Sequence, residues 1–202
     1  MKGRDIFLNF SGALLLIVGF LAVAYAIYVK NPADILWFCY TAIILSGIAI
    51  LRRDSRLLLA QLLIWIIPLI VWNIDFWYRL FSGFSLFGIT DYFFLPSRDL
   101  IANIISFQHI YIIPIAFGAL YLFKIKKNGA WKIALAEILF LFILTKIFTF
   151  PEINVNCVYY PCIPISISIP YWIAWWLSVA FIILITNYFL TNIRWFKAKI
   201  TH

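Results

Sequence analysis

Six long runs of apolar residues account for most of this 202-residue chain, and they limit the folds that it can adopt. A helix needs about 20 apolar residues to cross a bilayer. Backbone N–H and C=O groups inside hydrocarbon must be hydrogen bonded within their own segment or within a closed barrel. The runs are too continuous for barrel strands, which alternate over roughly 10 residues. The pattern therefore predicts an all-α polytopic membrane protein, a bundle of six transmembrane helices.

The expected helices cover residues 6–28, 33–51, 57–74, 100–123, 131–150 and 171–190. Hydrophobic residues make up 65% of the chain and charged residues only 12%, so little sequence remains for a soluble domain. We therefore interpret residues 1–202 as a single transmembrane helical domain. The first run is longer than the roughly 7–15 apolar residues of a signal-peptide core, and we expect it to remain as a helix.

The formal net charge of +8 is unevenly distributed along the chain. If six helices alternate in direction, one face of the membrane receives a large excess of basic residues, and the other face receives a mixture of acidic and basic ones. The basic face holds Lys2, Arg4, Arg52, Arg53, Arg56, Lys124, Lys126, Lys127, Lys132, Arg194, Lys197 and Lys199. Positively charged loops stay in the cytoplasm. We therefore expect a protein integral to the cell membrane with both termini cytoplasmic, and no nucleic-acid partner.

The loop between the third and fourth expected helices, residues 79–99, is unusually apolar. It contains two glycines and is too short to span the membrane, yet it is too apolar to be fully solvated. This composition predicts a surface-lying or partly re-entrant segment that caps the outer, non-cytoplasmic mouth of the bundle. At its end, either Ser97 or Asp99 is suited to cap the fourth helix.

Cys157 and Cys162 lie in the last outer loop, which is rich in proline. A disulfide between them is plausible on that face, because the compartment outside a cell membrane is commonly oxidising. Their spacing matches neither a redox CxxC pair nor a usual zinc knuckle. A structural disulfide, or two free thiols in a reducing habitat, therefore fits better than redox catalysis.

Several polar side chains interrupt the apolar runs at one level in the outer half of the membrane. At 1.5 Å per residue, Cys39 lies about 8 Å along the second helix and His109 about 14 Å along the fourth, both counted from the outer face. Asn73 and Asp75 stand near the outer end of the third helix. Glu137 is different, because it falls in the inner half of the fifth helix.

Most of these residues have an ordinary structural explanation when they are taken singly. A cysteine is comfortable in an apolar core, and Asn73 needs only a hydrogen bond to another helix. A histidine in lipid is more costly and normally needs a partner or a cavity. The combination at one depth therefore supports a sharper hypothesis, which depends on Cys39 and His109.

The chemistry that fits this combination is acyl transfer. A thiol becomes a good nucleophile when a base removes its proton, and histidine is the usual base. Cys39 would attack a lipid ester carbonyl, and His109 would accept the thiol proton and return it to the leaving alcohol. Asn73 or Asp75 would orient the imidazole or stabilise the oxyanion. A membrane lipid is the expected substrate.

The second-helix segment Leu36-Trp-Phe-Cys-Tyr40, the fourth-helix segment Ile105-Ser-Phe-Gln-His-Ile-Tyr111 and the six-helix layout together resemble YwaF-type integral membrane proteins. That group is similar to the transmembrane cysteine–histidine acyltransferase that remodels ether phospholipids, and more distantly to the androgen-induced intramembrane hydrolases. The resemblance covers most of the chain, and it implies a nucleophile at Cys39 and a base at His109.

The sequence contains no motif that is typical of the other enzyme classes considered. It contains no GxSG serine motif, no HExxH metal motif and no Gly-rich phosphate loop. One of its two histidines is the terminal His202, which excludes a multi-histidine metal site. We therefore expect no cofactor and no metal. The alternative to a lipid acyl hydrolase or acyltransferase is a non-enzymatic carrier, channel subunit or lipid-binding scaffold.

Overall fold

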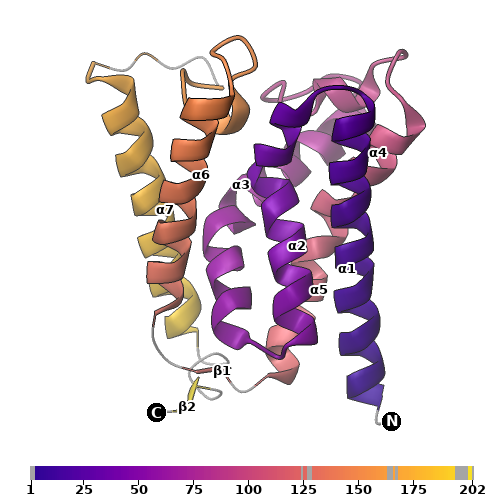
Figure 1. Cartoon of the computed structure of the whole chain (residues 1–202), viewed down its shortest axis with the longest axis vertical. Helices are drawn as coiled ribbons and strands as arrows, with labels where there is room; N and C mark the ends of the chain where they lie inside the picture. Colours follow the sequence, from indigo (N-terminus) through magenta and orange to yellow (C-terminus); the bar gives the residue numbers. More distant parts are fainter. Residues whose placement is uncertain are drawn as a thin grey trace.

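The computed structural model describes residues 3–123, 125–126, 129–162, 166, 168–193 and 200–201, and it is a bundle of helices (Figure 1). The α-helices are α1 (Gly3–Tyr28), α2 (Phe38–Leu51), α3 (Ser55–Ser82), α4 (Leu100–Ser106), α5 (Gln108–Leu122), α6 (Ala130–Phe148) and α7 (Tyr171–Asn192). Three short 3₁₀ turns are η1 (Pro32–Leu36), η2 (Asp91–Phe94) and η3 (Val155–Cys157). A parallel bridge joins β1 (Ile125–Lys126) to β2 (Ile200–Thr201).

The helices run between two ends of the bundle, and the short turns distinguish these ends (Figure 1). The end that carries η1, η2 and η3 is called the outer end here, and the end that carries the start of α1 and the β1–β2 pair is the inner end. The beginning of α1 and the end of the chain at β2 therefore lie on the same side of the molecule.

Four stretches of helix are long and apolar enough to cross a membrane: Gly3–Tyr28, Ser55–Ser82, Leu100–Leu122 and Tyr171–Asn192. The expected second span does not reach this length, because η1 and Trp37 separate its first residues from α2. The 14 residues of α2 cover about 21 Å, less than the roughly 30 Å of a hydrocarbon core. Helix α6 has 19 residues but carries Lys132, Glu137 and Lys146. The all-helical, membrane-type fold is confirmed, and six spans remain a prediction.

The third expected helix ends later than residue 74, and the fourth contains a break. Helix α3 continues past residue 74 to Ser82, where Gly83 ends it with a left-handed φ of 85°. The aromatic residues of this extension allow it, because amphipathic rings are favourable at the level where a bilayer meets water. The fourth expected span, 100–123, agrees with the apolar stretch Leu100–Leu122, which a break at Phe107 divides into α4 and α5. Asp99 caps α4 as expected, and its Oδ1 accepts a hydrogen bond from the backbone N–H of Ile101 at 2.8 Å.

Helices α1 and α2 approach each other closely where both carry glycine. A Cβ built on Gly47 of α2 would lie 3.0 Å from the carbonyl oxygen of Gly12 in α1, and one on Gly12 would lie 2.7 Å from Leu51 Cγ. Small residues drive helix association in membranes because they let backbones meet without a side chain between them. This pair of glycines therefore fixes how α2 lies against α1.

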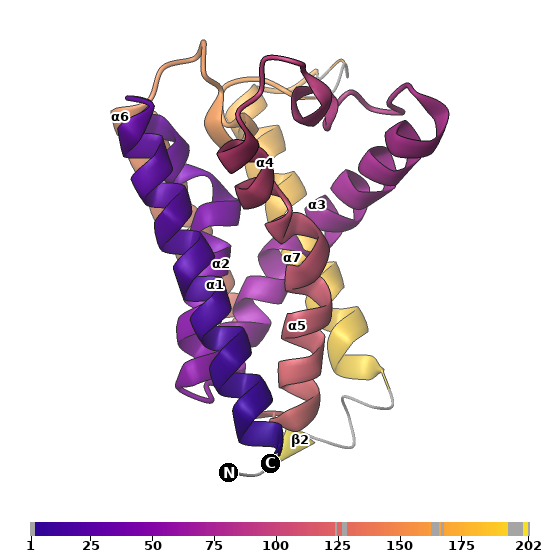
Figure 2. The ribbon, with the colours of Figure 1, turned by 90° about the vertical axis from the view of Figure 1, so that its right-hand side faces the viewer.

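Helix α3 lies in the middle of the bundle and contacts α2, α5, α6 and α7. Its leucines at 58, 62 and 63 are fully buried. Figure 2 shows that it crosses the bundle obliquely, so that its outer end lies away from the outer end of α1. In contrast to α3, helices α1 and α7 expose large apolar side chains on the sides that face away from the bundle, such as Phe10 and Phe181. Helices that are apolar on every face are typical of membrane spans.

Candidate functional site

His109 lies in the first turn of α5, and its ring has a defined environment. Its Nδ1 is 2.7 Å from the backbone carbonyl oxygen of Ser106. A carbonyl oxygen only accepts, so this contact assigns the proton to Nδ1 and leaves Nε2 as the acceptor. The ring also stacks on the indole of Trp72 from α3, with 4.7 Å between the ring centroids. His109 is thus held in the tautomer that a general base requires.

The loop before α4 reaches this ring stack through Tyr92 of η2. The indole Nε1 of Trp72 donates a hydrogen bond to the Tyr92 hydroxyl at 2.9 Å. Burial raises the pKa of Tyr92, so its phenol stays neutral. Neither Trp72 nor Tyr92 stands out in the sequence, because an aromatic residue near a helix end fits an interfacial belt equally well.

Asn73 contacts His109, but through the backbone. Its Nδ2 donates to the carbonyl oxygen of Leu69 at 2.8 Å and to that of His109 at 2.9 Å. The side chain therefore joins α3 to α5 and sets the height of His109, whereas sequence analysis expected it to orient the imidazole or stabilise an oxyanion.

Asp75 is also placed differently from the expectation. Its buried carboxylate accepts hydrogen bonds from the backbone N–H of Phe87 at 2.7 Å, from that of Thr90 at 2.9 Å and from the Thr90 hydroxyl at 2.8 Å. Three donors from the loop occupy the carboxylate. Asp75 therefore anchors the loop over the outer end of the bundle, and its carboxylate is committed to that structural role.

Cys39 is the second residue of α2 and is half-buried. Of the three cysteines it alone is free, because a disulfide joins Cys157 to Cys162. Within the described part of the chain, no hydrogen bond joins the Cys39 thiol to His109, whose Nδ1 instead faces Ser106. The structure thus brings Asn73 and His109 together and leaves Cys39 without a bond to either.

The disulfide loop fixes the chain just before Cys39. The side chain of Asn156 accepts from the backbone N–H of Phe38 at 2.9 Å and donates to the carbonyl oxygen of Leu36 at 2.7 Å. The Asn156 carbonyl accepts from the indole of Trp175 in α7 at 3.1 Å. This clamp joins η3 to the start of α2, so the last outer loop determines the position of the thiol.

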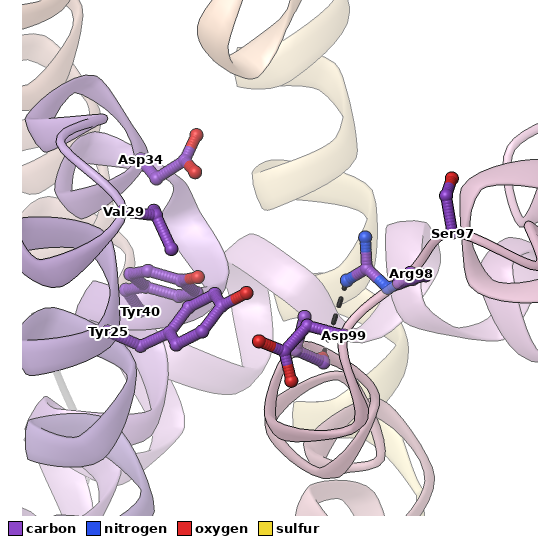
Figure 3. A pocket seen from close by; sticks show the side chains of 8 residues that line it. Tyr25, Val29, Asp34, Tyr40, Ser97, Arg98 and Asp99 are labelled. Carbon is purple, nitrogen blue, oxygen red and sulfur yellow. Dashed lines mark hydrogen bonds between the residues drawn. The ribbon is translucent and has the colours of Figure 1, made fainter.

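A polar cavity of about 350 Å³ opens at the outer end of the bundle (Figure 3), and its lining includes Tyr40, the residue after Cys39. It is lined by Tyr25, Val29, Asp34, Tyr40, Ser97, Arg98, Asp99 and Ala102. Figure 3 shows the hydroxyls of Tyr25 and Tyr40 pointing from α1 and α2 across to Asp99. The cavity could not be predicted from the sequence, because it lies between segments about 60 residues apart that no local pattern relates.

Arg98 connects this cavity to the histidine. Its Nε donates to Asn103 Oδ1 at 2.8 Å and its Nη2 donates to the Ser106 hydroxyl at 3.0 Å. Its guanidinium also lies over the ring of Tyr92, 4.5 Å from the centroid. Ser106 therefore contacts Arg98 with its hydroxyl and His109 with its carbonyl, and the cavity and the imidazole share one hydrogen-bond network.

A second polar contact lies in the inner half of the bundle. The amide of Gln61 in α3 donates to Glu137 Oε2 in α6 at 2.6 Å. Gln61 is fully buried, and its Oε1 has no hydrogen-bond partner among the described residues. The partner of Glu137 is thus a glutamine on α3, and the pair holds α3 against α6.

Comparisons of the chain with protein-family models, with curated proteins and with solved structures found no match, so the site is interpreted from its own geometry.

Proposed function

We propose that the chain is an integral membrane protein with six spans and both termini in the cytoplasm. Helices α2 and α6 lie within the same bundle as the four long apolar helices and run between the same two ends (Figures 1 and 2). The α2–α3 connection at the inner end carries the arginines at 52 and 53, and Arg56 lies in the first turn of α3. A basic inner end supports a cytoplasmic orientation.

For its activity, we propose acyl transfer from a lipid ester, with Cys39 as nucleophile and His109 as base. The Cys39 thiol gives its proton to His109 Nε2, and its sulfur forms a bond to the ester carbonyl carbon. The ester C–O bond then breaks, and the leaving alcohol takes the proton from Nε2. Water or a second alcohol then gives its proton to Nε2, and its oxygen forms a bond to the thioester carbonyl carbon. The C–S bond breaks, the acyl group leaves as a fatty acid or a new ester, and the Cys39 sulfur takes the proton back from Nε2.

The observation that carries this proposal is the contact between His109 Nδ1 and the Ser106 carbonyl at 2.7 Å. It leaves Nε2 free to accept a proton in the outer half of the bundle, where Cys39 begins α2. Catalysis then requires the thiol and Nε2 to approach when substrate binds. Such contacts often tighten only in the substrate complex.

A thiol-directed acyl probe tests the proposal in the full-length protein in detergent micelles. Labelling should occur at Cys39 and should fall at least tenfold in His109→Ala, because a protonated thiol is a poor nucleophile. Gln108→Ala serves as a neighbouring control, and we expect it to label normally. Because Cys157 and Cys162 are bonded, the probe signal in non-reducing buffer reports on Cys39 alone. Equal labelling rates in wild type and His109→Ala would contradict the proposal.

A non-enzymatic lipid-binding role is the second candidate, and the outer cavity favours it. The cavity is lined by charged and phenolic groups, while Cys39 and His109 are not bonded to each other among the described residues. Under this alternative, a lipid binds the purified protein with an affinity that Cys39→Ser leaves unchanged, and no acyl product forms.

A further inference from the structure

The outer cavity combines groups of opposite charge that form no direct ion pair among the described residues. Asp34 and Asp99 provide two carboxylates and Arg98 provides one guanidinium. Within the described residues, none of these three takes part in an ion pair; the pairs found there join Arg4 or Arg53 to Asp5 and Arg79 to Asp91. Asp34 and Arg98 are partly buried, whereas Asp99 is exposed at the mouth of the cavity. Charges that are partly buried are normally paired. A ligand that carries both signs would satisfy this requirement.

The two acidic groups are fixed in place by the fold. Asp34 Oδ1 accepts from the indole of Trp37 at 3.1 Å, and Asp99 Oδ1 caps the first turn of α4. Figure 3 shows the hydroxyls of Tyr25 and Tyr40 directed toward Asp99, while the Asp34 carboxylate points away from both rings. A carboxylate beside tyrosine rings, as at Asp99, favours an ammonium group, because both the charge and the negative ring faces attract it, and the charge of Asp34 adds to the acidic side of the cavity.

Arg98 provides the positive charge of the cavity, which would bind the anionic part of a ligand. Its hydrogen bonds to Asn103 and Ser106 hold the guanidinium at the edge of the cavity that faces α4. Its Nη2 also donates to the carbonyl oxygen of Ala102 at 3.3 Å. Among the described bonds, Nη1 is therefore the nitrogen left to donate to a phosphate, whose charge the guanidinium complements. A ligand with an ammonium group on the acidic side and a phosphate on the Arg98 side would be an amino-alcohol phosphate.

The cavity lies at the depth where the polar head of a membrane lipid is expected. Tyr25 lies three residues before the end of α1, and Asp99 immediately precedes α4, so the cavity is at the outer helix ends. Tyr40 follows Cys39 in the chain, and Arg98 reaches His109 through Ser106. A lipid head in the cavity would therefore place its ester groups near the proposed catalytic pair.

We infer that this cavity binds a zwitterionic phosphate head, with its ammonium group at Asp34 and Asp99 and its phosphate at Arg98. The inference rests on the proposed function for the identity of the ligand as the lipid substrate. The chemistry of recognition is shared by phosphatidylethanolamine and by free phosphoethanolamine, and these two sources are separated experimentally.

The test is titration calorimetry of the full chain in detergent with three probes: a short-chain phosphatidylethanolamine, the phosphatidylglycerol with the same acyl chains, and free phosphoethanolamine. The double variant Asp34→Asn/Asp99→Asn removes both charges and keeps an oxygen for Trp37 and for the α4 cap. Glu152→Gln is the matched control, because it removes an outer-loop carboxylate that does not line the cavity.

We expect phosphatidylethanolamine to bind at least tenfold more tightly than phosphatidylglycerol. The double variant should lose about tenfold in affinity for the ammonium probe, the usual scale for a lost charge-assisted contact, and Glu152→Gln should lose none. Competition by phosphoethanolamine would identify the soluble zwitterion as a ligand, and its failure to compete would identify the lipid. Equal binding of the two lipids, or an unchanged preference in the double variant, would overturn the inference.

The same titrations in Cys39→Ser separate this inference from the proposed catalysis. That variant has no thiol nucleophile, so catalysis is removed while the charges of the cavity remain. One outcome is that Cys39→Ser retains the preference for phosphatidylethanolamine over phosphatidylglycerol while wild type forms no acyl product. That result would contradict the catalytic proposal and would support the binding site.

Discussion

Removal of the Asn156 side chain should destabilise the outer end of the bundle and free the segment before Cys39. Asn156 is 8% exposed, and its side chain pairs with the Phe38 N–H and the Leu36 carbonyl. Each buried backbone group left unpaired costs about 1–3 kcal/mol. Asn156 also has a left-handed φ of 54°, in which alanine costs about a further 1–2 kcal/mol. We therefore expect Asn156→Ala to lower the free energy of unfolding by about 3–8 kcal/mol.

The assay is thermal unfolding of the purified protein in detergent, together with the rate of maleimide labelling at Cys39. For a chain of this size, each kcal/mol lowers Tm by roughly 2–4 °C, so a fall of about 6 °C or more is expected. Labelling should accelerate, because the chain before the thiol loses its clamp. Asn156→Gly keeps the left-handed backbone accessible and should lose the hydrogen bonds without the strain. A Tm of Asn156→Ala within 2 °C of wild type, with unchanged labelling, would refute the role of the clamp.

Three further substitutions test other contacts. Asp75→Asn should release the loop above α3 and increase its proteolysis by trypsin severalfold, because the charged acceptor of three loop hydrogen bonds is lost; equal digestion would contradict the anchoring role. Gln61→Leu should destabilise the bundle by about 1–3 kcal/mol in denaturant unfolding, since Glu137 would lose its donor, while Glu137→Gln should be tolerated; the reverse order would refute the pairing. Gly47→Val should lower the free energy of unfolding by about 1–3 kcal/mol, because its Cβ meets the Gly12 carbonyl at 3.0 Å; wild-type stability would show that α1 and α2 separate freely.

The long helices were predictable because hydrophobic periodicity and length are local properties. The expected spans 6–28 and 171–190 lie within α1 and α7, which differ from them by three residues or fewer at either end. The start of α2 was not predictable in the same way, because the short η1 turn interrupts an apolar run without a glycine. Its hydrogen bonds to Asn156, 118 or more residues away, stabilise the break.

The depth of the candidate site residues in the membrane was predictable from the sequence, but the groups that each of them contacts were not. Counting residues along the helices placed Asn73 and His109 at one level, and the structure joins them. The group that orients the imidazole could not be identified from the spacing of polar side chains, because it is the backbone carbonyl of Ser106, three residues earlier. The role of Asp75 depends on where an irregular loop passes, which no local pattern encodes.

The most direct test of the central claim is a search for an acyl-thioester at Cys39. The full-length protein is incubated with a phospholipid, stopped in acid and analysed by intact and peptide mass spectrometry. The account predicts a mass increase equal to one acyl chain on the Cys39 peptide, removed by neutral hydroxylamine and absent in Cys39→Ser and His109→Ala. An unmodified Cys39 peptide at every time point, in protein that binds the lipid and releases fatty acid from it, would contradict the account.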